Sequence, residues 1–240
     1  MRLDKYLCEA GFGTRSEVKK LLRSGVVTVN DTTATKPETK LQDGDRVFVS
    51  GKEVSFSSVE YWMLHKPAGY ISATEDRKLA TVLELLPENA RSDLFPVGRL
   101  DRDTEGLLLL TNDGKLAHYL LSPKRHVNKT YYARIRGQVK PEHVQDFLEG
   151  LDIGDEKKTL PARLRIIKSG PESEIEVTIR EGRYHQVKRM FEAIGCEVTY
   201  LKRLSMGSLK LDESLAPGEC RPLYEKELRN LKEETGCSME

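Results

Sequence analysis

Residues 98–114 read GRLDRDTEGLLLLTNDG, a polar loop that runs directly into four consecutive leucines. The leucine block at 107–110 is short, apolar and bounded by turn-forming residues, so it predicts a buried β-strand. The Asn-Asp-Gly at 112–114 predicts a turn after that strand, since these residues tolerate positive φ. Asp101 therefore lies on a loop at the edge of a rigid element, where catalytic groups are often held. By itself, an acidic loop of this kind fits an exposed turn at least as well.

Length and composition describe a globular protein with a limited charge imbalance. The 240 residues allow one or two domains, and the 39 basic and 38 acidic residues give a net charge of +1. This balance excludes a uniformly basic protein that coats nucleic acid, so any RNA contact must use local positive charge. No apolar run approaches the roughly 20 residues of a membrane span. We expect no membrane contact.

Cysteine usage and the first residues favour a cytoplasmic protein. The four cysteines form no C-x-x-C pair, which leaves zinc and redox motifs without support: Cys8, Cys196, Cys220 and Cys237. The chain start has no apolar core typical of a secretory signal. We therefore expect reduced thiols and a cytoplasmic location.

Residues 1–50 predict a small unit of their own. Helical spacing begins at Leu3, and Thr14 with Glu17 predicts a capping box that starts a second helix, which Gly25 ends. Strands are expected at 26–29 and 46–49. The first 30 residues carry six basic side chains against three acidic ones, and the basic ones are candidate phosphate contacts: Arg2, Lys5, Arg15, Lys19, Lys20 and Arg23.

This segment resembles the small RNA-binding domain named after ribosomal protein S-four, through the stretches 2–7, 15–16 and 25–30. The resemblance implies contact with structured RNA through the second helix, by Arg15, Lys19, Lys20 and Arg23. The polar segment 51–58 follows, and we expect it to be a linker.

Residues 59–232 predict a larger α+β domain, followed by a polar tail at 233–240. Strands are expected at 61–64, 107–110, 129–135, 160–167, 174–179 and 197–203, and helices at 81–86, 115–121, 141–151, 185–194 and from 223 onward. Helices scattered among antiparallel-looking strands favour a mainly antiparallel sheet over a parallel α/β fold.

Three motifs, together with the loop at 98–114, resemble the pseudouridine synthases that act on ribosomal RNA. They are Lys-Pro-Ala-Gly at 66–69, Lys-Thr-Tyr at 129–131 and His-Gln-Val-Lys-Arg at 185–189. The resemblance implies that Asp101 is the nucleophile and that the first motif supports the site. It further implies that Tyr131 stacks on the target base and can take its proton, and that Lys188 pairs with Asp101.

Other residues near these motifs have weaker assignments. Lysine lacks the bidentate fork of arginine, which many relatives carry at position 188, so the pairing geometry there is open. Asp103 lies outside the carried-over motif and is interpreted as a capping or solvated carboxylate. Arg99, His185 and Arg189 are candidate RNA contacts because they are basic or ionisable and lie beside the motifs.

The resemblance implies isomerisation of a uridine within small-subunit ribosomal RNA, naked or in a partly assembled particle, by a monomer. Bond exchange within one nucleotide is redox-neutral, so no cofactor or metal is expected. Attack of Asp101 on the sugar and attack on the base both remain open. So do large-subunit RNA as substrate, a non-catalytic ribosome-assembly factor, and a glycoside-type hydrolase.

Overall fold

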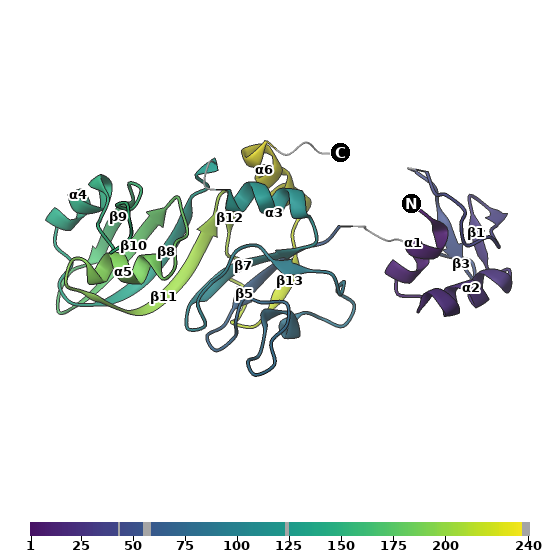
Figure 1. Cartoon of the computed structure of the whole chain (residues 1–240), viewed down its shortest axis with the longest axis horizontal. Coiled ribbons are helices and arrows are strands. Elements are labelled where there is room, and N and C mark those ends of the chain that lie inside the picture. The colour runs from purple at the N-terminus through teal and green to yellow at the C-terminus, as the bar shows by residue number, and fades with distance from the viewer. Residues whose placement is uncertain (43, 55–58, 123–124, 237–240) are drawn as a thin grey trace. The chain divides into compact units, whose positions relative to one another are not determined.

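The computed structural model describes residues 1–42, 44–54, 59–122 and 125–236, and it divides the chain into two compact units, Met1–Val59 and Glu60–Glu240. Figure 1 shows both units along the chain. The predicted α+β class is confirmed, because helices accompany mainly antiparallel sheets.

The first unit packs two helices on a four-stranded sheet. Its elements are α1 (Leu3–Glu9), α2 (Arg15–Arg23), β1 (Val27–Val29), β2 (Thr32–Thr33), β3 (Val47–Val49) and β4 (Lys52–Glu53), with strand order β2-β1-β3-β4. The predicted capping box is present, since Thr14 and Glu17 hydrogen-bond each other's backbone N–H groups. Capping fixes the start of α2 and so the direction of its basic face.

The expected linker at 51–58 is in part ordered. Lys52–Glu53 form β4, which pairs with β3, and Val54 is buried in the core of the first unit. The polar composition of this stretch is typical of a linker, but Lys52 and Glu53 hydrogen-bond to a neighbouring strand, a pairing that composition does not reveal. Residues 55–58 lie outside the described part of the chain.

The second unit is built on a nine-stranded sheet with the path β13-β5-β7-β11-β8-β10-β9. Its strands are β5 (Tyr61–Lys66), β6 (Phe95–Pro96), β7 (Glu105–Thr111), β8 (Lys129–Arg136), β9 (Arg163–Lys168), β10 (Glu172–Ile179), β11 (Glu197–Met206), β12 (Leu209–Lys210) and β13 (Cys220–Pro222). Its helices are the 3-10 helix η1 (Val82–Leu85), α3 (Gly114–Leu121), α4 (Glu142–Glu149), α5 (Gln186–Glu192) and α6 (Glu225–Thr235). Pairing is antiparallel except between β7 and β11.

The leucine block of β7 is buried on both faces of the sheet. Leu107 and Leu109 pack with α3 and α6, whereas Leu108 and Leu110 pack on the opposite face with residues around η1. This double coverage explains why the strand is uniformly apolar instead of alternating. The loop before β7 is consequently attached to one of the most rigid parts of the unit.

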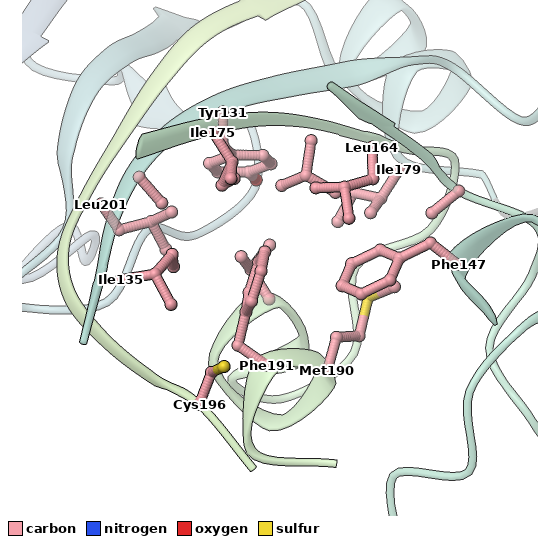
Figure 2. Packing of buried hydrophobic residues seen from close by; sticks show 14 of the residues in the cluster. Tyr131, Ile135, Phe147, Leu164, Ile175, Ile179, Met190, Phe191, Cys196 and Leu201 are labelled. Atoms are coloured by element: carbon pink, nitrogen blue, oxygen red, sulfur yellow. The ribbon is translucent and has the colours of Figure 1, made fainter. Parts of the chain in front are cut away.

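The other half of the sheet carries α4 and α5, which pack against β8–β11 (Figure 1). Figure 2 shows this core, in which Phe147 from α4 and Phe191 from α5 lie 5.1 Å apart between ring centroids. Tyr131 of β8 lies at the edge of the same cluster. The packing therefore fixes α5 and β8 relative to each other.

The end of the chain is ordered further than predicted. Helix α6 continues to Thr235, which is buried, and Gly236 closes it at φ +66°. The first polar residues of the expected tail, 233 and 234, therefore lie on the exposed face of this helix. Residues 237–240 of the expected tail, which include Cys237, lie outside the described residues.

Candidate active site

A cavity of about 1600 Å³ in the second unit brings the motif residues together. Most of its walls come from the turn at 68–74, the loop at 98–103 and the segment 180–185. Strand β8 adds two side chains, and α5 and β11 add one each. Asp101, Tyr131 and Lys188 all line it. Loops from distant parts of the sequence meet here because β7 and β11 are neighbours in the sheet.

Lys66 holds the loop that carries Asp101 through hydrogen bonds to its backbone. This lysine is fully buried at the end of β5, and its ammonium group donates to the carbonyls of Asp101 at 3.0 Å, Arg102 at 3.3 Å and Thr104 at 2.8 Å. Burial lowers the pKa of Lys66 to about 8, against the raising effect of nearby carboxylates. Ser72 adds a reciprocal pair of hydrogen bonds with the backbone of Leu100. The backbone around Asp101 therefore has little freedom to move.

The carboxylate of Asp101 is 28% exposed and has two ionisable neighbours from α5 and its N-cap. Lys188 Nζ lies 3.3 Å from Oδ2, and His185 Nε2 lies 3.6 Å from Oδ1. A carboxylate fixed in this way faces the cavity with its orientation set by α5.

Asp103 forms an ion pair with Lys188, which its interpretation as a capping or solvated carboxylate did not predict. Its two oxygens lie 2.7 and 2.8 Å from Lys188 Nζ, although its side chain is 72% exposed. Partial burial pushes the pKa of Asp103 upward, but the hydrogen bond and charge of Lys188 outweigh this and leave the pKa below its usual value. Burial likewise lowers the pKa of Lys188, and the two carboxylates overcome it and raise the pKa. One ammonium group thus serves both aspartates.

Tyr131 presents an aromatic ring to the cavity from a buried position. It is 7% exposed, and it shares the inward face of β8 with Lys129, Ala133 and Ile135 through the two-residue period of the strand. Packing in the cluster of Figure 2 fixes the ring. An aromatic ring and a carboxylate in the same cavity suit a planar heterocycle.

Comparisons with known proteins identify the family of this chain. The model of the RNA pseudouridylate synthase family matches residues 60–193, and that of the S4 domain matches residues 1–47. The chain belongs to the RNA pseudouridylate synthase family. It is thereby an isomerase family member with an N-terminal RNA-binding domain, as the motifs predicted.

Relatives of this synthase cover nearly its whole length. The ribosomal small subunit pseudouridine synthase A of Vibrio cholerae is 43% identical over 96% of this chain and 99% of its own. The ribosomal large subunit pseudouridine synthase B of Bacillus subtilis is 39% identical over 96% and 95%. A solved structure described as a pseudouridylate synthase has a TM-score of 0.69 at 36% identity, covering 96% of this chain and 99% of that one.

The candidate RNA contacts of the synthase differ in what already engages them. Arg15, Lys19, Lys20 and Arg23 are exposed on α2, whereas Arg2 pairs with Asp4 at 2.7 Å and Lys5 with Glu9 at 3.5 Å. Arg99 is exposed and lines the cavity. Arg189 donates to the carbonyls of Ile153 and Tyr184 and pairs with Asp155, so its guanidinium holds loops of the synthase together.

Two buried cations at the cavity were not singled out from the sequence. Lys129 is 8% exposed and Arg203 is 2% exposed, and both line the cavity. Burial, with a further contribution from Arg203, lowers the pKa of Lys129 to about 8. Lys129 could have been found, because the two-residue strand period places it on the same face as Tyr131. For Arg203 the sequence offers no comparable signal, since its partner, the Leu107 carbonyl, lies on a neighbouring strand that is far away in the sequence.

Three further observations concern membrane spans, metal ligands and cysteines. Within the described residues, no helix is long and apolar enough to cross a membrane, and no cluster of three metal-binding side chains occurs. Cys8, Cys196 and Cys220 are free thiols.

Proposed function

We propose that the protein converts one uridine of small-subunit ribosomal RNA to pseudouridine, with Asp101 as the nucleophile. The observation that carries this proposal is the Asp101 carboxylate itself. It is fixed through its backbone by Lys66, faced by Lys188, and exposed to a cavity that Tyr131 also lines. Relatives named for the small-subunit reaction, which match nearly end to end, support the choice of substrate.

The reaction breaks the bond between ribose C1′ and uracil N1 and forms one between C1′ and C5. In one route Asp101 attacks C1′ and uracil leaves as an anion; in the other it adds to the base at C6. The base then turns within the cavity and C5 bonds to C1′. The Asp101 carboxylate is released, by displacement from C1′ in the first route and by elimination from C6 in the second. The proton on C5 departs while N1 gains one. Tyr131 is the proposed acceptor of the C5 proton or a relay for it. The ammonium group of Lys188, 3.3 Å from Oδ2, holds the attacking carboxylate in its orientation.

The target base must leave its stack to reach Asp101. Extrusion costs a few kcal/mol, and an aromatic, partly apolar pocket compensates for it. Tyr131 and Leu100 supply such surface beside the carboxylate, and exposed Arg99 at the cavity wall suits a phosphate of the flipped nucleotide. In the first unit, the exposed basic face of α2 is the proposed contact with structured ribosomal RNA.

We further propose that the protein acts as a monomer in the cytoplasm. The chemistry is assigned to Asp101, Tyr131 and Lys188, and one copy of the chain carries all three in one cavity. Three free thiols suit a reducing compartment, where ribosomal RNA is made. Sedimentation of the purified protein at micromolar concentration tests the first point, and a dimer would contradict it.

The experiment that tests the function maps pseudouridine at single-nucleotide resolution. The full chain is incubated with small- and large-subunit ribosomal RNA, each naked and with bound ribosomal proteins. Carbodiimide labelling and primer extension then reveal modified positions. We expect one stop in small-subunit RNA that is absent with Asp101→Asn and retained with Asp103→Asn, a matched charge loss in the same loop.

Other outcomes favour the remaining candidates. A stop confined to large-subunit RNA would keep the chemistry and replace the substrate, as the 39% identical large-subunit relative allows. Release of free uracil, or an active Asp101→Asn variant, would overturn the mechanism. Tight RNA binding without any stop would favour an assembly factor.

A further inference from the structure

Tyr184 is the most exposed large apolar or aromatic side chain of the described residues. It is 77% exposed, yet it lines the same cavity as Asp101, so it lies at the rim. Single exposed aromatic rings are common on protein surfaces, so exposure alone assigns no role to this one. The local structure explains why this ring stays outside.

The backbone around Tyr184 is held by hydrogen bonds on both sides. The Arg183 N–H donates to the Gln186 side chain at 3.0 Å, and Arg189 donates to the Tyr184 carbonyl at 3.1 Å. The guanidinium of Arg183 donates to the carbonyls of Lys157 and Lys158 at 2.6 and 2.8 Å. The segment is therefore fixed to a neighbouring loop while its aromatic side chain points away.

His185 occupies the left-handed region at φ +48°, which is uncommon for a residue with a Cβ. Such strain persists only where the surroundings impose it, and it is concentrated at functional sites. His185 is the N-cap of α5, and its ring stacks on that of Tyr184, with centroids 3.9 Å apart and planes 16° from parallel. One face of Tyr184 is covered by His185, and the other remains open.

We propose that the open face of Tyr184 stacks on an unpaired RNA base next to the target uridine. This inference rests on the proposed function and names a subsite for its substrate. His185 lies 3.6 Å from Asp101, so Tyr184 is one stacked ring further out than the group that meets the reacting nucleotide. That place suits a neighbouring base better than the reacting one.

The charge around the rim supports a nucleic-acid occupant. Arg99, Arg102 and Arg180 are exposed and line the same cavity, where they can meet phosphates on either side of an extruded nucleotide. Stacking on a ring that is already oriented avoids much of the entropy lost when a free side chain is ordered. Any base offers a π-face, so the contact adds affinity without strict sequence preference.

The test combines protein and RNA changes. Wild type, Tyr184→Ala and Tyr184→Phe are assayed on the RNA that wild type modifies, and on the same RNA with an abasic residue immediately 5′ or 3′ of the target. We expect Tyr184→Ala to raise KM roughly 5- to 150-fold on intact RNA with kcat nearly unchanged, and Tyr184→Phe to resemble wild type. On one of the two abasic RNAs the variant and wild type should become equal. Tyr224→Ala, which removes another exposed aromatic ring in the second unit, is the matched control and should behave like wild type.

Two results would overturn the inference. One is an unchanged KM for Tyr184→Ala on intact RNA. The other is an equal loss on intact RNA and both abasic RNAs, which would indicate a contact with the target or with the backbone. Failure of the proposed function is separate, because wild type itself would then produce no pseudouridine on any ribosomal RNA.

Discussion

Helices α2 and α5 both carry basic side chains at helical spacing, and the sequence predicted RNA contacts on both. On α2, Lys19 and Arg23 are exposed, and within the described residues neither side chain has a hydrogen bond or ion pair. On α5, Lys188 pairs with two aspartates from another part of the chain, and Arg189 is bound to the loop at 153–155. Helical charge spacing is the same signal in the two cases. The difference between the two helices comes from the acidic partners of α5. These lie tens of residues away in the sequence, so a local pattern does not indicate them.

Of the variants that test this comparison, the loss of the Lys188 charge on α5 has the largest expected effect on kcat. Lys188→Gln should lower kcat by roughly 10²–10³-fold with little change in KM, because the ammonium group orients a reacting carboxylate. Single-turnover rates on the mapped substrate measure this. Lys188→Arg keeps the charge and should stay within about tenfold of wild type. An equal loss in both variants would instead indicate that the helix no longer packs correctly.

Lys66 sharpens the comparison, since it is a cation used wholly for internal structure. Lys66→Met leaves several buried carbonyls without a donor and should lower the free energy of unfolding by about 3 kcal/mol. Urea unfolding measured at pH 7 tests this. A loss below about 1 kcal/mol would show that the loop keeps its shape without the lysine.

The pH dependence of the same pair of proteins has a definite sign. Burial lowers the pKa of Lys66 from 10.5 to about 8, so between these values the unfolded chain binds the proton more strongly than the folded one. The free energy of unfolding of wild type therefore increases as pH rises through this window, by at most about 1.4 kcal/mol per pH unit. The difference between wild type and Lys66→Met should accordingly increase from pH 8 to pH 9.5, and a flat difference would contradict the lowered pKa.

The α2 side of the comparison predicts a smaller and salt-dependent effect. The double variant Lys19→Gln, Arg23→Gln should weaken RNA binding about tenfold near 0.1 M salt and reduce the slope of log affinity against log salt by roughly 1.5, with kcat unchanged. Filter binding across a salt series measures both quantities. Lys226→Gln, Arg229→Gln removes the same charge from exposed positions of α6 and is the control. A loss of equal size in the control would show a general charge effect.

Local rules sufficed for much of the fold. The capping box at Thr14 predicted the start of α2, and the leucine block predicted β7. They did not predict the parallel pairing of β7 with β11, because that pairing depends on a glycine and a partner nearly a hundred residues apart. Gly106 has φ +103°, and a Cβ there would lie 2.3 Å from the Arg203 carbonyl oxygen. The closeness of these two backbones positions the Asp101 loop.

The motif residues of the site could likewise be located from the sequence. The contact of one lysine, Lys188, with two aspartates could not. Nothing in residues 98–114 indicates that Lys188 meets Asp103 at shorter distance than Asp101. Whether a carboxylate is paired depends on the side chain that approaches from α5, and α5 is fixed by the core of Figure 2. The same limit applies to Tyr184, whose exposure is set by the hydrogen bonds around it.

Asp103→Asn has the smallest expected effect, and it tests what the shared lysine does. If Lys188 serves chiefly to orient Asp101, loss of the Asp103 charge frees the ammonium group for one partner, and kcat should change less than about fivefold in either direction. The side chain of Asp103 is 72% exposed, so solvent already screens much of its attraction for Lys188. Measuring kcat for Asp103→Asn, Lys188→Gln and the double variant completes a cycle. If Asp103 acts only through Lys188, its loss has no further effect once the lysine is gone, and the double variant should match Lys188→Gln. A double variant markedly slower than Lys188→Gln would instead mean that Asp103 contributes to the reaction independently of the lysine.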